Sequence, residues 1–551
     1  MIATITVDEK TFGDKLLFKN LKISLQDGEK VGLIGRNGAG KTSLFHIIAG
    51  EDKDFQGEIV LKRSTSMIST RQEHHGYEDM LVMTYILQDL PEFSKLKRIM
   101  DTYPETMGDN MRLITEYSQA LERYDHLGYY TIEDEVLQTL ETFQLEHKAY
   151  ERIGDLSGGQ KRLIEVAKVM QSRSHLALVD EPTNHMDYLA KARFLQWFQA
   201  AKETVLVITH DRDVLQTVDR IIEIKDSNVQ SFKGNYDAYL AQNAHHTTGQ
   251  MNEFDLVQKR IINLRVKVLE YQRFKEKANH PGTIQRFKRL EQGARDELAE
   301  LEAKEKPTFW IDRESVDAMG LKTGAQYEKF KAKNIKMNSD KTDEGNSRLL
   351  IDVQKVSLGY GDSPLFKDIT FQVREGEIVE LRGRNGAGKT TLIKSLLAAG
   401  AHEKTLPARV FGGEMHVGDK VTIGVYEQEI SPELFDKSLE KAIEIVYLSR
   451  NLSIGETKIR QLLNDYLFTA GDAKLPVKLL SGGQKARLQL IAMLASNPSL
   501  LVLDEPTNHL DLPSIEEMET ALKNYTGAIL YVSHDSYFRK ALEGSIVQVG
   551  S

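Results

Sequence analysis

The chain has 551 residues, too many for one hydrophobic core, so its length predicts two large domains and a connecting segment. Hydrophobic residues make up 40% and charged residues 28%, which is ordinary for globular proteins and excludes the disordered and fibrous classes. The absence of cysteine excludes disulfides, iron–sulfur clusters and thiolate zinc sites, and the net charge of −9 disfavours whole-surface binding of nucleic acid while allowing a local basic patch.

The beginning of the chain predicts neither export nor a membrane span. Its first residues, MIATITVDEKTFGDK, lack a basic region followed by an apolar one. No run approaches the roughly 18 to 20 apolar residues that cross a bilayer. We therefore expect a cytoplasmic protein without contact to a membrane.

The sequence contains an internal duplication. Four motifs occur twice in the same order: GRNGAGKT at 35–42 and 383–390, LSGGQ at 156–160 and 480–484, DEPTNH at 180–185 and 504–509, and T/S-H-D at 209–211 and 533–535. The last three pairs share one spacing, whereas the two copies of GRNGAGKT lie further apart. We expect copy one over 1–235, a linker over 236–347 and copy two over 348–551.

Each GRNGAGKT segment follows an apolar strand, VGLIG or IVELRG, and precedes a helix. This is the context of a phosphate-binding loop, in which backbone amides and the positive end of the helix face phosphate oxygens. We expect Lys41 and Lys389 to contact the β- and γ-phosphates, and Thr42 and Thr390 to contact a magnesium ion. The predicted nucleotide-binding residues are Gly35, Asn37, Gly38, Gly40, Lys41, Thr42 and Ser43, with Gly383, Asn385, Gly386, Gly388, Lys389, Thr390 and Thr391.

Two further pairs of residues flank these loops. Phe12 and Tyr360 precede a glycine upstream of each loop and are predicted to stack on adenine, although either one alone is equally well explained by core packing. Gln72 and Gln428 follow the strands STSMIST and VTIGVYE, where a glutamine can sense magnesium and the attacking water. We therefore include all four in the predicted nucleotide sites, and count Gln72 and Gln428 among the predicted magnesium ligands as well.

Copy one has a longer segment between Gln72 and Ser157 than copy two has between Gln428 and Ser481. From about 90 to 130, leucines and aromatic residues recur at helical spacing with polar residues between them. This pattern predicts a helical hairpin inserted in copy one, here called the arm. A surface decoration without a partner is the alternative.

The strands HLALVD and SLLVLD each end in an acidic pair. Asp180 and Asp504 are predicted to hold magnesium through its water shell, and Glu181 and Glu505 to polarise the attacking water. An isolated histidine after a strand is usually structural. His210 and His534, however, recur at the spacing that LSGGQ and DEPTNH share, and are predicted to steady the γ-phosphate as catalytic residues.

The linker is charged, nearly free of proline and periodic, which predicts two long helices separated by ANHPG at 278–282. A short third helix over 316–334 and a polar join at 338–347 follow. Between 259 and 289 there are ten Lys or Arg against two Glu, so the hairpin is basic in an acidic chain.

Lys and Arg neutralise phosphates, so this hairpin predicts RNA binding, with a solvated hairpin as the alternative. We expect Tyr271, Phe274 and Phe287 to pack between the helices rather than on bases. The predicted RNA-binding residues are Arg273, Lys275, Lys277, Arg286, Lys288 and Arg289.

These motifs, in this order, resemble the ATP-binding cassette superfamily over nearly the whole chain. The resemblance implies an α/β fold of two P-loop cassettes that pack head to tail within one monomer and hydrolyse ATP to ADP and phosphate with Mg²⁺. It also implies that each LSGGQ faces the opposite phosphate loop, closing with ATP and opening after hydrolysis. Site one would combine Lys41, Thr42, Gln72, Asp180, Glu181 and His210 with Ser481, Gly482 and Gly483, and site two Lys389, Thr390, Gln428, Asp504, Glu505 and His534 with Ser157, Gly158 and Gly159.

Two cassettes on one chain, a charged helical linker and the arm resemble the ABC-F subgroup, whose members act on the ribosome. The resemblance implies ribosomal RNA and exit-site or peptidyl-site tRNA as partners, with the linker in the tRNA exit site. The short ANHPG turn favours a translation factor over a protein of antibiotic resistance, which stays the alternative within the subgroup.

Two other classes of ATPase fit the sequence less well. A transporter ATPase with separate membrane subunits needs a groove near the glutamine of each cassette, where the arm would lie in copy one. A DNA-organising or repair ATPase would carry longer coiled coils inside the cassette, or zinc sites made of cysteine, so we expect no DNA partner.

Overall fold

The structure is a computed structural model that describes residues 1–551 except 14, 72, 226, 278–279, 303–347, 402–404, 427–429, 467, 469–470, 481, 509 and 551. It divides into two compact units, one of Met1–Tyr236 with Asn334–Ser551 and the other of Asp237–Lys333. Both copies therefore belong to the first unit, and the linker helices form the second. The expected third helix, the polar join, Gln72, Gln428 and Ser481 lie outside the described residues.

Copy one is built on a mainly parallel sheet of six strands with the order β5-β6-β7-β3-β8-β9, in which the β8–β9 pair is antiparallel. Its strands are β3 (Lys30–Gly35), β5 (Met67–Ser69), β6 (Leu176–Asp180), β7 (Thr204–Ile208), β8 (Arg220–Lys225) and β9 (Asn228–Lys233). An antiparallel sheet of order β2-β1-β4 contains β1 (Ala3–Phe12), β2 (Lys15–Leu25) and β4 (Gln56–Leu61). Because β6, β7 and β3 are parallel neighbours, their carboxyl ends lie at one edge of the sheet, where ligands bind in such folds.

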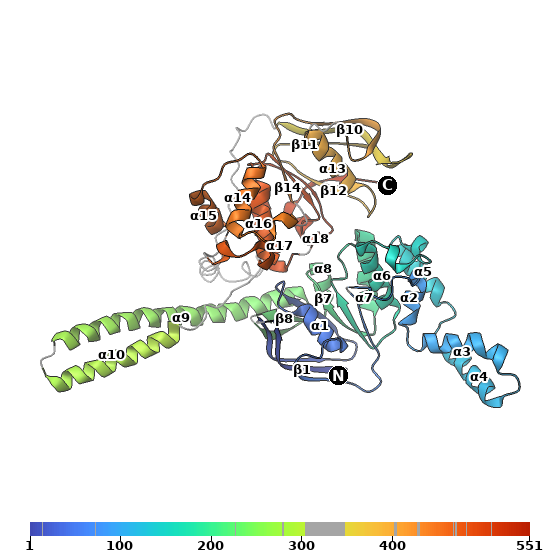
Figure 1. Ribbon diagram of the computed structural model, residues 1–551, viewed down its shortest axis with the longest axis horizontal. Coiled ribbons are helices and arrows are strands. Elements are labelled where there is room, and N and C mark those ends of the chain that lie inside the picture. Colours follow the sequence, from blue (N-terminus) through green and yellow to red (C-terminus); the bar gives the residue numbers. More distant parts are fainter. Residues whose placement is uncertain are drawn as a thin grey trace. The chain divides into compact units, whose positions relative to one another are not determined.

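Copy one contains eight α-helices in its described part, of which α3 and α4 project away from the sheet (Figure 1). The helices are α1 (Lys41–Ala49), α2 (Val82–Gln88), α3 (Phe93–Thr106), α4 (Met111–His126), α5 (Ile132–Thr142), α6 (Gly158–Gln171), α7 (Tyr188–Ala200) and α8 (Arg212–Leu215), with short 3₁₀ turns η1 (Glu146–Lys148) and η2 (Ile153–Asp155). The LSGGQ motif starts α6 through a capping box, since the Ser157 hydroxyl accepts from the Gln160 amide while the Gln160 side chain accepts from the Ser157 amide.

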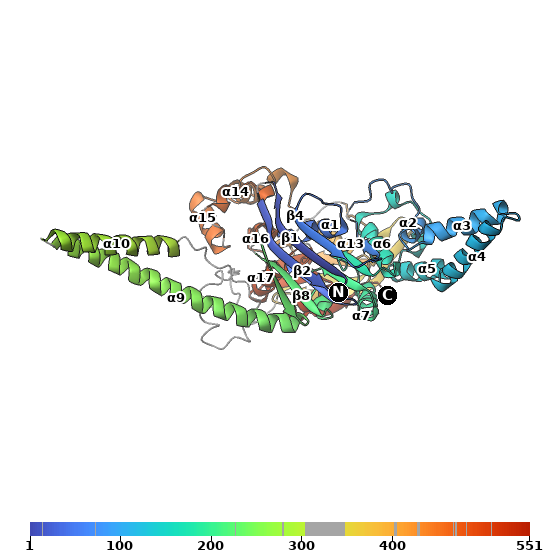
Figure 2. The same ribbon diagram turned by 90° about the horizontal axis from the view of Figure 1, so that it is seen from below.

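The predicted arm consists of α3 and α4, which lie side by side in both views (Figures 1 and 2). At its base, the ring of Phe93 lies 5.4 Å from the ring of Tyr129 and 6.0 Å from that of Tyr124. Arg123 of α4 forms an ion pair of 2.6 Å with Glu92, which directly precedes α3. The arm is thus packed onto copy one at its root.

Copy two repeats this plan, with a parallel sheet of order β14-β15-β16-β12-β17 and an antiparallel sheet of order β11-β10-β13. Its strands are β10 (Leu349–Tyr360), β11 (Ser363–Arg374), β12 (Ile378–Arg382), β13 (Arg409–Val417), β14 (Ile423–Tyr426), β15 (Leu500–Asp504), β16 (Ala528–Val532) and β17 (Ser545–Gln548). The helices are α13 (Lys389–Gly400), α14 (Leu439–Ser449), α15 (Glu456–Asp465), α16 (Gly482–Leu494), α17 (Leu512–Lys523) and α18 (Ser536–Leu542), with 3₁₀ turns η3 (Pro432–Leu434), η4 (Asp472–Lys474) and η5 (Val477–Leu479). The predicted α/β duplication is therefore confirmed.

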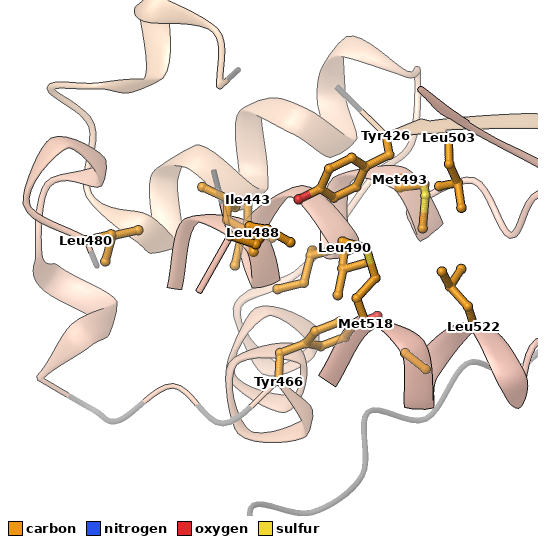
Figure 3. Packing of buried hydrophobic residues seen from close by; sticks show 14 of the residues in the cluster. Tyr426, Ile443, Tyr466, Leu480, Leu488, Leu490, Met493, Leu503, Met518 and Leu522 are labelled. Carbon is orange, nitrogen blue, oxygen red and sulfur yellow. The ribbon is translucent and has the colours of Figure 1, made fainter. Parts of the chain in front are cut away.

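An apolar core joins the sheet of copy two to its helical layer. Figure 3 shows this cluster, in which Tyr426 of β14 and Leu503 of β15 lie near Met493 of α16, with Met518 and Leu522 of α17 below them. Burial of such side chains contributes roughly 1.5 to 3 kcal/mol each. The helix α16, which follows the LSGGQ motif of copy two, is thereby held against β15, which ends at the acidic pair.

The second unit contains α9 (Tyr236–Lys277) and α10 (Pro281–Glu302), which lie side by side as a hairpin (Figures 1 and 2). Leu264, Val268 and Ala294 form its small core. The rings of Phe274 and Phe287 pack across the helices at 5.4 Å, as predicted. None of the helices in the described part of the chain combines the length and hydropathy that a bilayer span requires.

Candidate nucleotide sites

The phosphate loops follow β3 and β12 in the two copies, and each loop encloses its lysine. Lys41 Nζ donates to the carbonyl oxygens of Gly35 at 2.6 Å and Arg36 at 3.3 Å, and Lys389 Nζ makes the same two bonds in copy two at 2.8 and 2.9 Å. Burial lowers the pKa of both lysines. A buried ammonium group inside a loop of backbone amides is a suitable partner for the phosphates of ATP.

Glycine is required at the end of each loop. Gly40 and Gly388 have φ angles of 96° and 94°, a region that other residues rarely adopt. A Cβ atom at Gly40 would lie 2.7 Å from the ring of Phe18, and one at Gly388 would lie 2.8 Å from the ring of Phe366. The loop can therefore turn its amides inward only with glycine at these positions.

Four of the six predicted magnesium ligands form one pair in each copy, and the other two, Gln72 and Gln428, lie outside the described residues. The Thr42 hydroxyl donates to Asp180 at 3.2 Å, and the Thr390 hydroxyl donates to Asp504 at 2.8 Å. Within the described chain, no group of three or more His, Cys, Asp or Glu residues could hold a metal. One hydroxyl and one carboxylate fit Mg²⁺, which completes its shell with water and substrate phosphates.

The glutamate that follows each aspartate lies beside the predicted histidine. Glu181 and Glu505 have φ angles of 46° and 47°, and strained backbone of this kind is typical of functional sites. His210 Nε2 lies 3.4 Å from a carboxylate oxygen of Glu181, and His534 Nε2 lies 3.2 Å from one of Glu505. Neither ring nitrogen of His210 has a hydrogen-bond partner within the described chain, which leaves the ring available to a phosphate.

The same environment shifts the pKa of these groups. Burial raises the pKa of Glu181 to about 8, with the charge of Asp180 adding to the effect, and raises the pKa of Glu505 to about 7. Burial also lowers the pKa of His210 and lowers that of His534 to about 3, so both imidazoles are neutral near pH 7. A carboxylate with a raised pKa is a stronger base once ionised, which suits activation of water.

A cavity of about 540 Å³ lies at the phosphate loop of copy two. Its lining from copy two includes Tyr360, Asn385, Gly386, Gly388, Lys389, Thr390, Thr391, Asp504, Glu505 and His534, and its lining from copy one is Thr183, His185 and Met186. Copy one therefore closes the nucleotide site of copy two. Tyr360 is 56% exposed and Phe12 is 72% exposed, so neither ring is part of a core.

Reciprocal contacts between the copies involve two aspartates that the sequence analysis missed. Asp187 accepts hydrogen bonds from the Asn385 amide at 3.3 Å and from Arg384 Nε at 3.2 Å. Asp511 accepts one from the Asn37 amide at 3.2 Å. Each aspartate of one copy thus contacts the phosphate loop of the other. The two aspartates repeat at the same spacing as LSGGQ and DEPTNH, and this repetition was the signal that could have identified them.

A second cavity, of about 290 Å³, joins the catalytic groups of the two copies. Its lining includes Glu181 and His210 from copy one and Glu505 and His534 from copy two. Ser157, Gly158 and Gly159 start α6 and do not belong to the described lining of the copy-two cavity. Gly482 and Gly483 start α16. The pairing of each LSGGQ with the opposite phosphate loop therefore stays a prediction.

The structure leaves four of the six predicted RNA-binding side chains exposed on the linker hairpin. These four are Arg273, Arg286, Lys288 and Arg289. Lys275 is instead bonded to Glu291 across the hairpin at 2.5 Å, and the side chain of Lys277 lies outside the described part of the helix.

Comparison with known proteins gives the same assignment. The family described as ABC transporter matches residues 18–184 and 366–508. The chain is 28% identical to the ribosome protection protein VmlR of Bacillus subtilis, over 98% of the chain and 84% of VmlR. It is also 28% identical to the energy-dependent translational throttle protein EttA of Mycobacterium tuberculosis, over 98% of the chain and 89% of EttA.

A solved structure of the RNase-L Inhibitor superimposes with a TM-score of 0.55 at 15% identity, covering 98% of this chain and 86% of the other. This likeness shows the two-cassette fold. The matched family covers both copies, including both phosphate loops and both acidic pairs. The chain therefore belongs to the ABC transporter family of ATP-binding cassettes and is an ATP hydrolase with two cassettes, and its homologues include members of the ABC-F subfamily.

Proposed function

We propose that this ATPase is a cytoplasmic translation factor that acts as a monomer on the ribosome. ATP with Mg²⁺ closes the two cassettes on two composite sites, and hydrolysis reopens them. The linker hairpin enters the tRNA exit site and contacts ribosomal RNA and exit-site or peptidyl-site tRNA. The two assignments, a clamp and a ribosomal partner, rest on different observations.

The reciprocal contacts between the cassettes carry the clamp assignment. Asp187 and Asp511 each bind the loop that holds the opposite nucleotide, so a change at one nucleotide acts directly on the other cassette. Glu181 and Glu505 would polarise the attacking waters, while His210 and His534 would bind the γ-phosphates. Ser157 and Ser481 would reach the phosphates when the cassettes are closed.

The basic hairpin carries the ribosomal assignment. Arg286, Lys288 and Arg289 are exposed on α10, and Arg273 is exposed on α9. Exposed cations on a helical hairpin release counterions when they bind RNA phosphates. The names of EttA and VmlR, a translational throttle and a ribosome protection protein, support the same partner. Protection against an antibiotic, the role of some members of this subfamily, is the second candidate.

Co-sedimentation with ribosomes tests the clamp. The double variant Glu181→Gln, Glu505→Gln keeps its ATP but loses the base, so it should pellet with ribosomes when ATP is present and stay in solution without it. Pelleting that does not depend on ATP would contradict the clamp. No pelleting of a folded, ATP-bound variant would contradict the ribosomal partner and favour a transporter role.

Charge reversal tests the hairpin. Changing Arg286, Lys288 and Arg289 to Glu should weaken ribosome binding and reduce the salt dependence by about one unit per lost phosphate contact, with basal ATPase retained. Reversal of the exposed Lys19, Lys22 and Arg63 of cassette one makes the same change of charge elsewhere and serves as the control. Equal effects of the two triple variants would show that only net charge matters.

A further inference from the structure

Cassette one contains a buried ionic cluster beside the segment that carries Gln72. Its centre is the pair Glu165 and Lys168 on α6, whose side chains are both fully buried. The remaining members come from the segment after β5 and from the end of α2. We call this set the Glu165 cluster, and it comprises Glu165, Lys168, Arg71, His74, Tyr85 and Asp89.

Both carboxylate oxygens of Glu165 are occupied. One accepts from the Arg71 amide at 2.8 Å and from Lys168 Nζ at 2.7 Å. The other accepts from His74 Nε2 at 2.8 Å and from the Tyr85 hydroxyl. Burial acts to raise the pKa of Glu165, but the bond from His74 and the charge of Lys168 outweigh it and lower the pKa to about 2. The group is therefore an anion with a full set of donors.

The arrangement fixes the chain on both sides of Gln72. Arg71 precedes this residue directly, and His74 follows it by two positions. One carboxylate therefore holds the backbone before Gln72 and a side chain after it. Because Glu165 lies on the rigid helix α6, the held segment cannot move without breaking buried, charged hydrogen bonds, which are costly to leave unmade.

The cluster also reaches the root of the arm. Asp89, the residue that ends α2, lies 3.4 Å from Lys168 Nζ and accepts a hydrogen bond from Arg71 at 3.1 Å. The arm helix α3 begins shortly afterwards at Phe93. One network of ion pairs and hydrogen bonds thus links the segment around Gln72 to α6 and to the base of the arm.

Cassette two has no such cluster at the corresponding place within the described residues. At the spacing that relates the two LSGGQ motifs, Gln489 replaces Glu165 and Ala492 replaces Lys168. The β-bridges Leu81–Arg152 and Ser438–Pro476 align α2 with α14. This alignment places Ala442 where cassette one has Tyr85 and Val446 where it has Asp89.

A cavity of about 300 Å³ lies at this place in cassette two. Ile430, Val446, Gln489 and Ala492 are part of its lining. Gln489 accepts a hydrogen bond from the Tyr426 hydroxyl at 3.1 Å. The lining also contains the charged residues Glu433 and Arg450, and Arg450 donates a hydrogen bond to the carbonyl oxygen of Ala492. Among the described residues, the buried Glu165–Lys168 pair of cassette one is therefore replaced by the neutral Gln489 and Ala492.

We propose that Glu165 is a positioning residue for ATP hydrolysis at site one, where it holds the Gln72 segment in the reactive arrangement, and that the neutral Gln489 is not an ionic counterpart of it in cassette two. The proposal rests on the roles proposed above for Gln72, Glu181 and Glu505. It makes the two chemically similar sites unequal. A small misplacement of a group that orients the reacting water lowers the rate of the chemical step without a matching loss of substrate binding.

Glu165→Gln tests this in two backgrounds. With Glu505→Gln only site one retains its base, and with Glu181→Gln only site two does. We expect Glu165→Gln to lower kcat about tenfold in the first background, with the KM for ATP changed less than about twofold, and to leave the second background unchanged. Glu135→Gln removes an exposed carboxylate that pairs with Arg173 and is the control for the same chemical change.

A double variant and a measurement of hydrogen exchange test the proposal independently of the first variant. Glu165→Gln with Lys168→Ala gives cassette one the pair that cassette two has, without an unpaired buried charge, and should show the same selective loss. Hydrogen exchange of the peptide 67–80, followed without nucleotide, should become faster in both variants. Equal loss of kcat in the two backgrounds, or unchanged exchange with unchanged kcat, would overturn the proposal.

The background variants also separate this proposal from the catalytic roles themselves. If either single glutamine variant has no turnover before Glu165 is changed, the two sites hydrolyse ATP only together, whereas normal hydrolysis by the Glu181→Gln, Glu505→Gln double variant would contradict the roles proposed for these two glutamates. The exchange of 67–80 then decides the positioning role, because that measurement needs no turnover.

Discussion

The two cassettes are nearly identical in the phosphate loops and acidic pairs. They differ in the residues at the position of Glu165, which lie behind these groups. The Thr42–Asp180 and Thr390–Asp504 bonds measure 3.2 and 2.8 Å, and the two lysines make the same pair of loop bonds. The position of Glu165 in cassette one, however, is a neutral glutamine beside a cavity in cassette two. Few kinds of group can bind a phosphate, so the loops of the two cassettes are alike. Buried groups away from the phosphate can be packed in more than one way.

The contact between the cassettes shows the same contrast. Asp187 and Asp511 bind the opposite phosphate loops symmetrically. Arg212 of cassette one, by contrast, is 5% exposed and forms an ion pair with Glu519 of cassette two, whereas the residue at the corresponding place in cassette two is Ser536. The two halves therefore share a reciprocal contact at the phosphate loops and an unequal one away from the loops.

We expect the greatest loss of ATP turnover from a variant that removes the chemistry shared by the two cassettes. Glu181→Gln with Glu505→Gln should lower ATP turnover by at least about 100-fold, because a general base contributes roughly 10²- to 10⁴-fold. Phosphate release measures turnover, and equilibrium binding of a fluorescent ATP analogue checks that affinity is retained. Normal hydrolysis by the double variant would show that neither glutamate is the base.

A smaller loss is expected where the contact is unequal. Arg212→Ala leaves the carboxylate of Glu519, 13% exposed, without its partner and should cost about 3 kcal/mol. Chemical denaturation followed by tryptophan fluorescence measures the loss. Arg123→Ala at the base of the arm breaks an ion pair whose two partners are 45% and 44% exposed, and should change stability little. Similar losses of stability in both variants would show that the Arg212–Glu519 pair between the cassettes contributes no more than the exposed pair at the arm.

Lysine substitutions test whether the two phosphate loops bind ATP equally. Lys41→Ala and Lys389→Ala should each weaken ATP binding at their own site by about 10- to 100-fold, since each removes a charge-assisted bond to phosphate. Titration calorimetry on the two single variants gives the two site affinities. A large effect at only one site would show that the loops differ despite their matching bonds.

The smallest effect concerns the two aromatic residues. Tyr360→Ala and Phe12→Ala should each weaken ATP binding by up to about tenfold, because stacking on a base contributes about 1 to 3 kcal/mol and both rings are partly solvated. Tyr360→Phe keeps the ring and should bind ATP like the wild type. If Tyr360→Phe is as weak as Tyr360→Ala, the hydroxyl that lies 3.4 Å from Thr391 is the important group instead.

Much of the site could be predicted because its residues lie at the ends of strands. The strand HLALVD and the strand TVLVIT became the neighbours β6 and β7, which brings Glu181 to His210. Asp187 was missed although it repeats at the same spacing as the motifs, because a carboxylate near a helix start is ordinarily a cap. Asp187 does cap α7, and its second oxygen contacts the other cassette.

The Glu165 cluster illustrates the opposite case. A glutamate and a lysine three residues apart on a helix normally form a solvated pair, and no spacing in the sequence indicates that Arg71, His74, Tyr85 and Asp89 converge on them. The residues meet because α2 and the segment after β5 pack against one face of α6. Their energies depend on burial, which a linear pattern does not report.

Repeats, strand ends and turn residues were therefore enough to predict the duplication, the two nucleotide sites, the arm and the basic hairpin, because local spacing determines which side chains share an edge or a face. The folded chain was needed to show the aspartates that reach across to the opposite loop, the buried Arg212–Glu519 pair and the cluster around Glu165. The contacts between the cassettes join residues that lie hundreds of positions apart in the sequence, and the hydrogen bonds of Glu165 reach residues up to 94 positions away. Such distances are closed by packing rather than by local pattern.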